Sequence, residues 1–285
     1  MTSIGIIGGS GLYTLDTMIG ARTVDVPTPY GAPSGPLFTG RMAGREVVFL
    51  SRHGFGHRLL PGEVPYRANI FALRELGVRR VLAISAVGSL TQRLAPGTLV
   101  VPDQIVDRTK GVRPSTFFGD GVVGHVAMAE PFCQSLRQDL VKSAMDPAGA
   151  DSPSPGVVDG GTYCCIEGPQ FSTRAESRLY RSWGLDIIGM TAMPEAALAR
   201  EAQLCYAGLA LVTDYDCWHE TAETVSVGLV AETMRANLAT ARTVLAATIA
   251  GLEVDADCSC HHALDAAVMT DPALIPPFLR RQMAF

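Results

Sequence analysis

The stretch Ile4-Gly5-Ile6-Ile7-Gly8-Gly9-Ser10-Gly11-Leu12 opens this chain and joins a β-branched run to a glycine loop. The run predicts a buried first strand, which ends where the glycines begin. Glycine tolerates the backbone dihedrals that let successive N–H groups converge on an anion. We therefore expect an anion-binding loop at the end of the first strand.

This loop departs from the fingerprint of dinucleotide-binding domains. That fingerprint reads G-x-G-x-x-G, and its third glycine packs the following helix against the strand. From Gly9 this chain reads Gly-Ser-Gly-Leu-Tyr-Thr, so the third glycine is missing. We also expect no second strand that ends in a ribose-binding acid, because Asp25 stands just before a turn-rich stretch. An NAD-dependent oxidoreductase is therefore the less favoured alternative.

Composition limits the classes of function that the chain can have. Its 285 residues are 47% hydrophobic and 18% charged, as expected for a globular protein with a large core. A net charge of -5 argues against nucleic acid as a partner, because no basic stripe is present to meet a phosphate backbone. No apolar run approaches the ~20 residues that span a bilayer, and the N-terminus has no secretory pattern. We expect a cytoplasmic protein that binds neither membranes nor nucleic acid.

Strand and helix patterns alternate along the chain. Apolar runs predict strands at 47–51, 81–85, 98–102, 104–106, 186–190 and 205–213. Three- and four-residue spacing predicts helices at 66–76 and 131–143, and helices that start at Pro194 and near Ser226. Such alternation predicts one α/β domain whose sheet is covered by helices on both faces. The Pro-, Ser- and Gly-rich segment 146–161 is expected to be a surface loop within it.

Polar side chains gather where the predicted strands end. Ligands bind at this edge of open α/β sheets. Four strand ends offer hydrogen-bond donors: Ser10, Arg52 with His53, Ser85 and Thr191. Arginine supplies a charged, bidentate fork, and Thr191 precedes a helix N-terminus, which favours anions. These donors together predict a phosphate site.

The strand at 205–213 leads into Thr213-Asp214-Tyr215-Asp216-Cys217-Trp218. A buried aspartate with a raised pKa can hold a proton and donate it. The alternative to this catalytic role is that the aspartates only form an Asx-turn at the strand end. The two carboxyl groups are the strongest candidates for acid–base chemistry in this sequence.

Five motifs in order make the chain resemble the methylthioadenosine phosphorylases of the trimeric purine nucleoside phosphorylase family. The resemblance covers nearly all of residues 4–252 and rests on the segments 5–12, 52–54, 128–132, 166–176 and 213–218. It implies a nucleoside phosphorylase fold with a central mixed β-sheet flanked by helices. It also implies attack of phosphate on C1' of a nucleoside, through a transition state like an oxocarbenium ion. Inorganic phosphate is then a co-substrate, and no cofactor is expected.

The resemblance also implies the roles of individual residues. Asp214 hydrogen-bonds at purine N7 as the catalytic residue, and Asp216 supports the 6-amino group. Met190 lies along the ribose, Phe171 covers the base, and Tyr215 belongs to the same substrate site. The phosphate-binding residues are Ser10, Arg52, His53, Ser85, Ala86 and Thr191.

Three positions bear on substrate choice within the family. Acids at 214 and 216 favour adenine, because 6-oxopurine enzymes have an asparagine at or near 214. Val227 suits a 5'-methylthio group, where relatives that bind a 5'-hydroxyl have a polar residue. Ser172 is a further specificity position. The resemblance therefore implies S-methyl-5'-thioadenosine as substrate, with methylthioinosine or general purine nucleosides as the alternative. A nucleoside-binding protein without turnover is a further alternative.

Assembly and the C-terminal tail complete the expectations. His125 matches a histidine that reaches the neighbouring subunit's 5' pocket, which implies a homotrimer or a dimer of trimers. We expect one domain at 1–252 and a tail at 253–285 that packs on it.

The tail contains two cysteines and two histidines within five residues, Cys258-Ser259-Cys260-His261-His262. This motif could bind metal, form a disulfide or be passive. No metal site is expected, because no second Cys/His pair lies nearby in the chain. Some archaeal relatives can form a disulfide at this pair.

Overall fold

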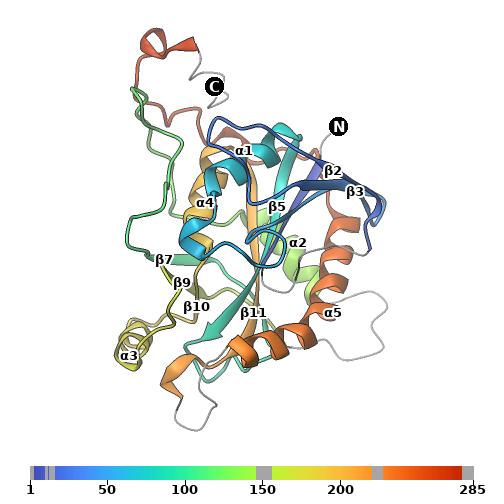
Figure 1. Cartoon of the computed structure of the whole chain (residues 1–285), viewed down its shortest axis with the longest axis vertical. Coiled ribbons are helices and arrows are strands. Elements are labelled where there is room, and N and C mark those ends of the chain that lie inside the picture. Colours follow the sequence, from blue (N-terminus) through green and yellow to red (C-terminus); the bar gives the residue numbers. More distant parts are fainter. Residues whose placement is uncertain (1–2, 10–11, 13–16, 146–155, 220–226, 278–285) are drawn as a thin grey trace.

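A mixed sheet forms the centre of the molecule, with helices on both sides (Figure 1). This computed structural model describes residues 3–9, 12, 17–145, 156–219 and 227–277. The strands are β1 (Ser3–Gly8), β2 (Ile19–Val24), β3 (Leu37–Met42), β4 (Arg45–Ser51), β5 (Val78–Ser89), β6 (Leu99–Val101), β7 (Gln104–Arg108), β8 (Val157–Asp159), β9 (Thr162–Ile166), β10 (Ile187–Gly189) and β11 (Cys205–Asp214). The helices are α1 (Tyr66–Glu75), α2 (Gln134–Met145), α3 (Arg174–Ser182), α4 (Ala192–Glu201) and α5 (Val227–Gly251), with 3-10 turns η1 (Pro61–Glu63), η2 (Asp216–Trp218), η3 (Ser259–His262) and η4 (Pro272–Leu274).

Strand β5 organises the sheet, because it pairs with three neighbours. It runs parallel to β1 and β11, and its last residues pair antiparallel with β10. The main path through the sheet is β2-β3-β4-β1-β5-β10-β9-β7, and β11, β6 and β8 branch from β5. The parallel strands β1, β4, β5 and β11 therefore bring their carboxyl ends to one edge.

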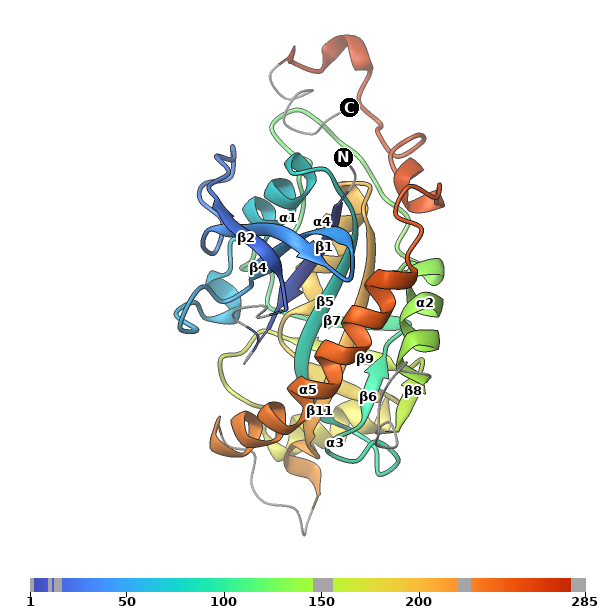
Figure 2. The ribbon, with the colours of Figure 1, turned by 90° about the vertical axis from the view of Figure 1, so that its right-hand side faces the viewer.

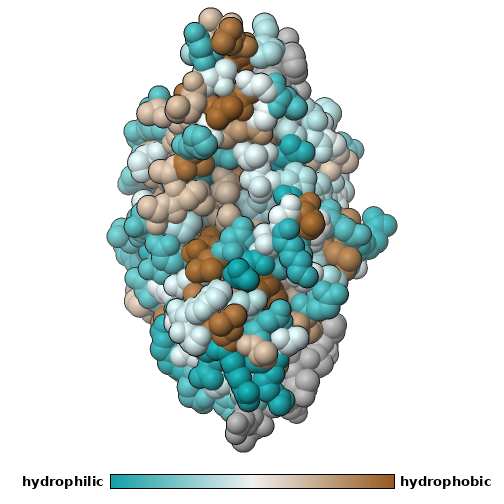
Figure 3. Space-filling model, turned by 90° about the vertical axis from the view of Figure 1, so that its left-hand side faces the viewer, coloured by the Kyte–Doolittle hydropathy of each residue, from teal (hydrophilic) through white to brown (hydrophobic). Residues whose placement is uncertain are grey.

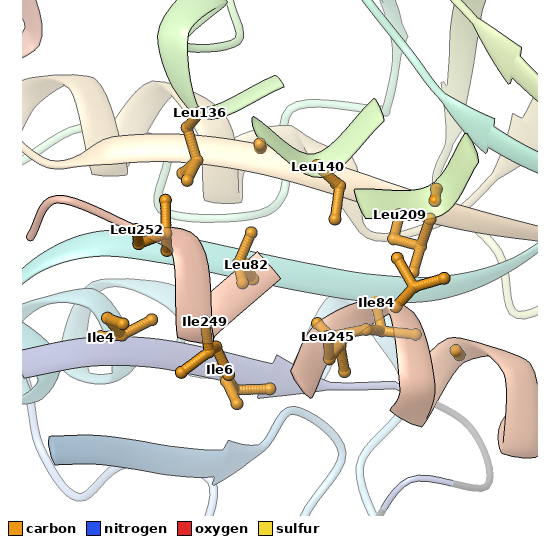
Figure 4. Packing of buried hydrophobic residues seen from close by; sticks show 14 of the residues in the cluster. Ile4, Ile6, Leu82, Ile84, Leu136, Leu140, Leu209, Leu245, Ile249 and Leu252 are labelled. Atoms are coloured by element: carbon orange, nitrogen blue, oxygen red, sulfur yellow. The ribbon is translucent and has the colours of Figure 1, made fainter. Parts of the chain in front are cut away.

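Two apolar cores fix the helices on the sheet, as the alternation of side chains in β1 illustrates. Ile4 and Ile6 pack with Leu245 and Ile249 of α5 (Figure 4). Ile7 points to the opposite face, into the core that contains α1 and α4. Figure 2 shows α5 and α2 on one side of the sheet and α1 and α4 on the other. The expected α/β architecture with helices on both faces is confirmed.

The predicted elements all occur, and several others were missed. Sequence patterns gave no indication of β3, β9 or α3, and β8 lies inside the segment that we expected to be a loop. We expected no second strand that ends in a ribose-binding acid, but a strand, β2, does end at Val24, directly before Asp25. That strand is an exposed edge strand separated from β1 by β3 and β4, so it does not form a dinucleotide-binding crevice with β1.

An arm extends from one end of the molecule. We define it as residues 117–125 and 263–275, which lie side by side in Figures 1 and 2. His125 N–H donates to the Ala267 carbonyl at 2.8 Å, and Met269 N–H donates to that of Val123 at 2.8 Å. Figure 3 shows hydrophobic groups at this end of the molecule among polar surface. Among the described helices, none has both the length and the apolar character needed to cross a bilayer.

Candidate active site

A cavity of about 300 Å³ opens at the carboxyl ends of β1, β4, β5 and β11. Residues from segments far apart in the sequence line it, because the parallel strands end together. The lining residues predicted from sequence are Arg52, His53, Ser85, Ala86, Phe171, Ser172, Met190, Thr191, Asp214 and Asp216. The fold therefore brings the predicted donors and the predicted acids into one cavity.

Arg52 is held at the cavity wall by a buried carboxylate. Its Nε and Nη2 donate to the two oxygens of Glu195 at 2.7 and 2.8 Å, and Nη1 donates to the Ile84 carbonyl at 2.9 Å. Tyr206 donates to Glu195 as well, at 2.8 Å. Since guanidinium has five N–H groups, two remain for an anion after these contacts. The bidentate pair fixes the orientation of the arginine.

The glycine loop comes close to this arginine. A Cβ at Gly9 would lie 2.6 Å from the Ile84 carbonyl oxygen and 3.0 Å from Nη1 of Arg52. Only glycine lets the backbone approach β5 and Arg52 this closely. Ser10, the predicted side chain of the loop, lies outside the described residues.

His53 is a neutral hydrogen-bonding group at the cavity. Burial and the positive charge of Arg52 lower the pKa of His53 to about 4. Its Nδ1 lies 2.9 Å from the Leu59 carbonyl oxygen, an acceptor only, so Nδ1 carries the proton of the neutral ring. The other nitrogen, Nε2, is then an acceptor. His57 stacks on this ring with centroids 4.3 Å apart.

The start of α4 supplies the next part of the wall. Thr191 is the N-cap residue of α4, and its side chain makes no capping hydrogen bond. Arg113 fixes the preceding backbone, because Nη1 donates to the carbonyls of Met190 and Met193 at 2.7 Å each. Glu167 accepts from Nε of Arg113 at 2.6 Å. Thr191 therefore lines the cavity from a fixed position.

The two aspartates lie together at the end of β11. Oδ1 of Asp214 accepts from the Asp216 N–H at 2.8 Å, and Oδ2 lies 2.7 Å from the Thr213 hydroxyl. Burial raises the pKa of Asp214, and it raises that of Asp216 to about 6, with the nearby charge of Asp214 adding to the effect. Oδ2 of Asp216 is buried without a hydrogen-bond partner among the described residues. Both carboxyl groups therefore hold a proton to higher pH than exposed aspartates do.

Two predicted residues that the structure describes, Tyr215 and His125, do not line the cavity. Tyr215 stacks on His219 beside it, with ring centroids 4.7 Å apart. His125 is exposed on the arm. Val227 is the first residue of α5, and its side chain, like Ser10, lies outside the described set.

Sequence reasoning missed Glu195 and Arg113, which hold the predicted residues in place. Glu195 reads as an ordinary acid in a helical first turn, and it lies 143 residues from Arg52 in sequence. A buried charge needs a partner, but no local pattern indicates which distant residue supplies it. Both residues act by positioning others.

Comparisons with known proteins agree with this geometry. Residues 3–250 match the model of the Phosphorylase superfamily. The S-methyl-5'-thioadenosine phosphorylase of Geobacter sulfurreducens is 50% identical over 96% of this chain and 93% of its own length. A methylthioadenosine phosphorylase from an antarctic soil metagenomic library has a similar crystal structure, with a TM-score of 0.91 and 47% identity over 99% of this chain and 98% of that one. The Schistosoma mansoni methylthioadenosine phosphorylase in complex with adenine gives a TM-score of 0.86 and 40% identity over 96% of this chain and all of that one.

Proposed function

This chain belongs to the phosphorylase superfamily, and we propose that it cleaves S-methyl-5'-thioadenosine with phosphate to give adenine and 5-methylthioribose 1-phosphate. Phosphate attacks C1' as the bond to the purine breaks, and positive charge develops on the sugar. The site must hold the phosphate, position the ribose and neutralise charge on the leaving purine. The combination of anion donors and two aspartates with raised pKa values in one cavity carries the proposal.

The hydrogen-bond donors around Arg52 bind the phosphate. The guanidinium, the hydroxyl of Thr191 and Ser85 with Ala86 at the end of β5 line one side of the cavity. His53 is neutral above about pH 4, so its Nε2 can accept the remaining O–H of hydrogen phosphate. Ser10 is proposed to add a hydroxyl from the glycine loop.

The aspartate pair matches the edge of adenine. Purine N7 accepts a hydrogen bond, whereas the 6-amino group donates one. A pair that shares one proton offers one donor and one acceptor, and we assign the contact at N7 to Asp214 and the 6-amino contact to Asp216. A 6-oxopurine presents acceptors at both positions, and a singly protonated pair meets only one of them. This mismatch favours adenine.

The remaining contacts concern the sugar and the base face. Met190 is assigned to the ribose and Phe171, which is 44% exposed at the cavity, to the face of the base. Tyr215 and Ser172 are assigned to the same substrate region, and Val227 to the 5'-methylthio group. An apolar 5' pocket gains only modestly from the thioether, so adenosine is expected to be a weaker substrate.

A homotrimer with shared sites, or a dimer of such trimers, is part of the proposal. His125 does not line this chain's own cavity and stands exposed on the arm, as a residue for a neighbouring site would. Apolar side chains on the arm are exposed too: Val123 by 52%, Met269 by 71% and Leu274 by 74%. Surface of this kind is typical of protein interfaces.

A domain at 1–252 with a packed tail at 253–285 and a cytoplasmic location complete the proposal. None of the seven cysteines, all of which the structure describes, forms a disulfide, which fits a reducing compartment.

A phosphorolysis panel tests the function. Methylthioadenosine, adenosine, methylthioinosine and inosine are compared at saturating phosphate by their kcat/KM values. We expect methylthioadenosine to lead and the 6-oxopurines to be slowest. Absence of adenine release with phosphate present contradicts the proposal, whereas tight binding without product indicates a binding protein.

Adding a methyl group at Gly88 is expected to disturb the acid pair. A Cβ at Gly88 would lie 2.9 Å from Oδ1 of Asp214 and 3.1 Å from Cγ2 of Ile188. Since a displacement near 1 Å can cost about 100-fold in rate, Gly88→Ala should lower kcat/KM for methylthioadenosine by about that factor. Gly208→Ala in β11 is the control, because its Cβ would meet ordinary contacts at 3.4 Å. Equal activity of the two variants would contradict the prediction.

The raised pKa of Asp216 predicts how stability depends on pH. The folded state binds this proton with a pKa of about 6, above the unfolded value of 3.8, so its stabilising contribution is lost as pH rises through 6. Asp216→Asn mimics the protonated form. The unfolding free energy of the variant minus that of wild type should therefore increase from pH 4 to pH 8, by on the order of 3 kcal/mol at most. Urea unfolding at a series of pH values measures the difference, and a pH-independent difference would refute it.

A further inference from the structure

Four cysteines meet at one point of the fold, outside the candidate active site. We propose that Cys133, Cys205, Cys258 and Cys260 bind one zinc(II) ion as a tetrathiolate site, which anchors the C-terminal tail to the domain. The spacing along the chain predicts no such site, because Cys258 and Cys260 have no second pair near them in sequence. The fold supplies that second pair from Cys133, directly before α2, and Cys205, the first residue of β11.

The sulfur positions fit a tetrahedral metal site. All four Sγ atoms lie within 4.8 Å of one another, and Sγ of Cys133 is 3.7 Å from Sγ of Cys258. Zinc–sulfur bonds of about 2.3 Å place the corners of a tetrahedron about 3.8 Å apart. The four sulfurs therefore already stand near coordination distance.

Three separate segments aim the cysteines at this point. Cys133 directly precedes α2, and its N–H donates to the Tyr206 carbonyl at 2.8 Å, which ties it to Cys205 at the start of β11. Cys258 is extended (φ −151°, ψ 143°), whereas Cys260 lies within the turn η3. This change of direction between the two residues brings both thiols of the Cys-x-Cys pair to one side. Cys133, Cys205 and Cys260 are buried, and Cys258 is half-buried.

Groups around the sulfurs suit thiolate ligands. Nη1 of Arg200 lies 3.4 Å from Sγ of Cys260. Nε2 of His261 lies 3.4 Å from Sγ of Cys205, and Nδ1 of the same ring lies 2.6 Å from Nη2 of Arg79. Because arginine only donates, Nδ1 is the acceptor and Nε2 carries the proton toward the sulfur. These donors, with the arginine charges, offset the net charge of -2 expected for zinc with four thiolates.

The four sulfur ligands determine which metal ion the site favours. Soft thiolate ligands in a tetrahedral arrangement favour zinc or iron over magnesium, calcium or manganese. A site with four protein ligands has no open position, so the ion is structural. Binding releases the thiol protons to solvent. The ion would fix η3 against the start of α2 and β11, immediately before the tail enters residues 263–275 of the arm, where the Ala267 carbonyl accepts from the His125 N–H.

Metal analysis of the full-length protein tests the proposal. The protein is produced in zinc-replete medium, purified with a non-thiol reductant and dialysed without chelator. We expect about one zinc per chain and four sulfur neighbours near 2.3 Å by X-ray absorption. After cobalt(II) exchange we expect the intense visible d–d bands of a tetrahedral site and near-ultraviolet thiolate-to-metal charge transfer.

Two variants give the matched comparison. Cys258→Ser with Cys260→Ser removes both ligands on the tail and should abolish zinc binding. Cys164→Ala removes a buried cysteine outside the cluster and should keep it. Zinc-free wild type with four free thiols overturns the proposal, as do disulfides among these cysteines in place of metal. Zinc retained by the double variant overturns it as well, since the ion is then elsewhere. None of these readouts depends on activity.

Discussion

Replacing Asp214 by asparagine is expected to lower kcat/KM for methylthioadenosine by about 10²–10⁴-fold, the usual contribution of general acid–base catalysis. The amide cannot ionise or share a proton with Asp216, so charge on the departing adenine is met by a weaker donor. Because the substitution keeps the shape of the side chain, the contacts from Thr213 and the Asp216 N–H retain their geometry as far as an amide allows. Steady-state rates at saturating phosphate measure the loss.

The same variant should change base preference. An asparagine amide can donate to O6, so the ratio of kcat/KM for methylthioinosine to that for methylthioadenosine should rise. Asp107→Asn provides a control, since Asp107 is an exposed acid on β7 that does not line the cavity. If Asp214→Asn kept wild-type rates and preference, Asp214 would have no role at the purine.

Replacing Arg52 by alanine is expected to damage both stability and phosphate binding. Arg52 and Glu195 are each about 1% exposed, and the substitution leaves the Glu195 carboxylate buried without its cation. Removing one partner of a buried ion pair costs about 3–5 kcal/mol of unfolding free energy. Loss of charged hydrogen bonds worth about 1.5–3 kcal/mol should also raise KM for phosphate by roughly 10- to 100-fold.

A double variant separates these two effects. Arg52→Met with Glu195→Met removes both charges and fills the space, so it should recover much of the stability. It should keep the raised KM for phosphate, because the cation at the cavity is still absent. Urea unfolding and phosphate titrations measure the two quantities. Recovery of both by the double variant would mean that Arg52 acts only through stability.

Much of the fold could be predicted from local hydrophobic patterns in the sequence. The apolar runs at 47–51, 81–85 and 205–213 correspond to β4, part of β5 and β11, because a strand buried on both faces needs continuous apolar residues. β2 and β8 were missed for the converse reason. β2 is exposed along most of its length and β8 has only three residues, so neither carries a strong hydrophobic pattern.

The sequence by itself determined which chemistry was possible: a glycine loop, donors at strand ends and two acids after a buried strand. These features are local, since strand ends and glycines can be recognised from their immediate neighbours. Only the tertiary structure decided which groups meet. It paired Arg52 with Glu195, placed Asp216 where burial raises its pKa, and gathered four cysteines from three segments. Such contacts depend on where parallel strands end and on how much water is excluded there, and both follow from packing of the whole chain.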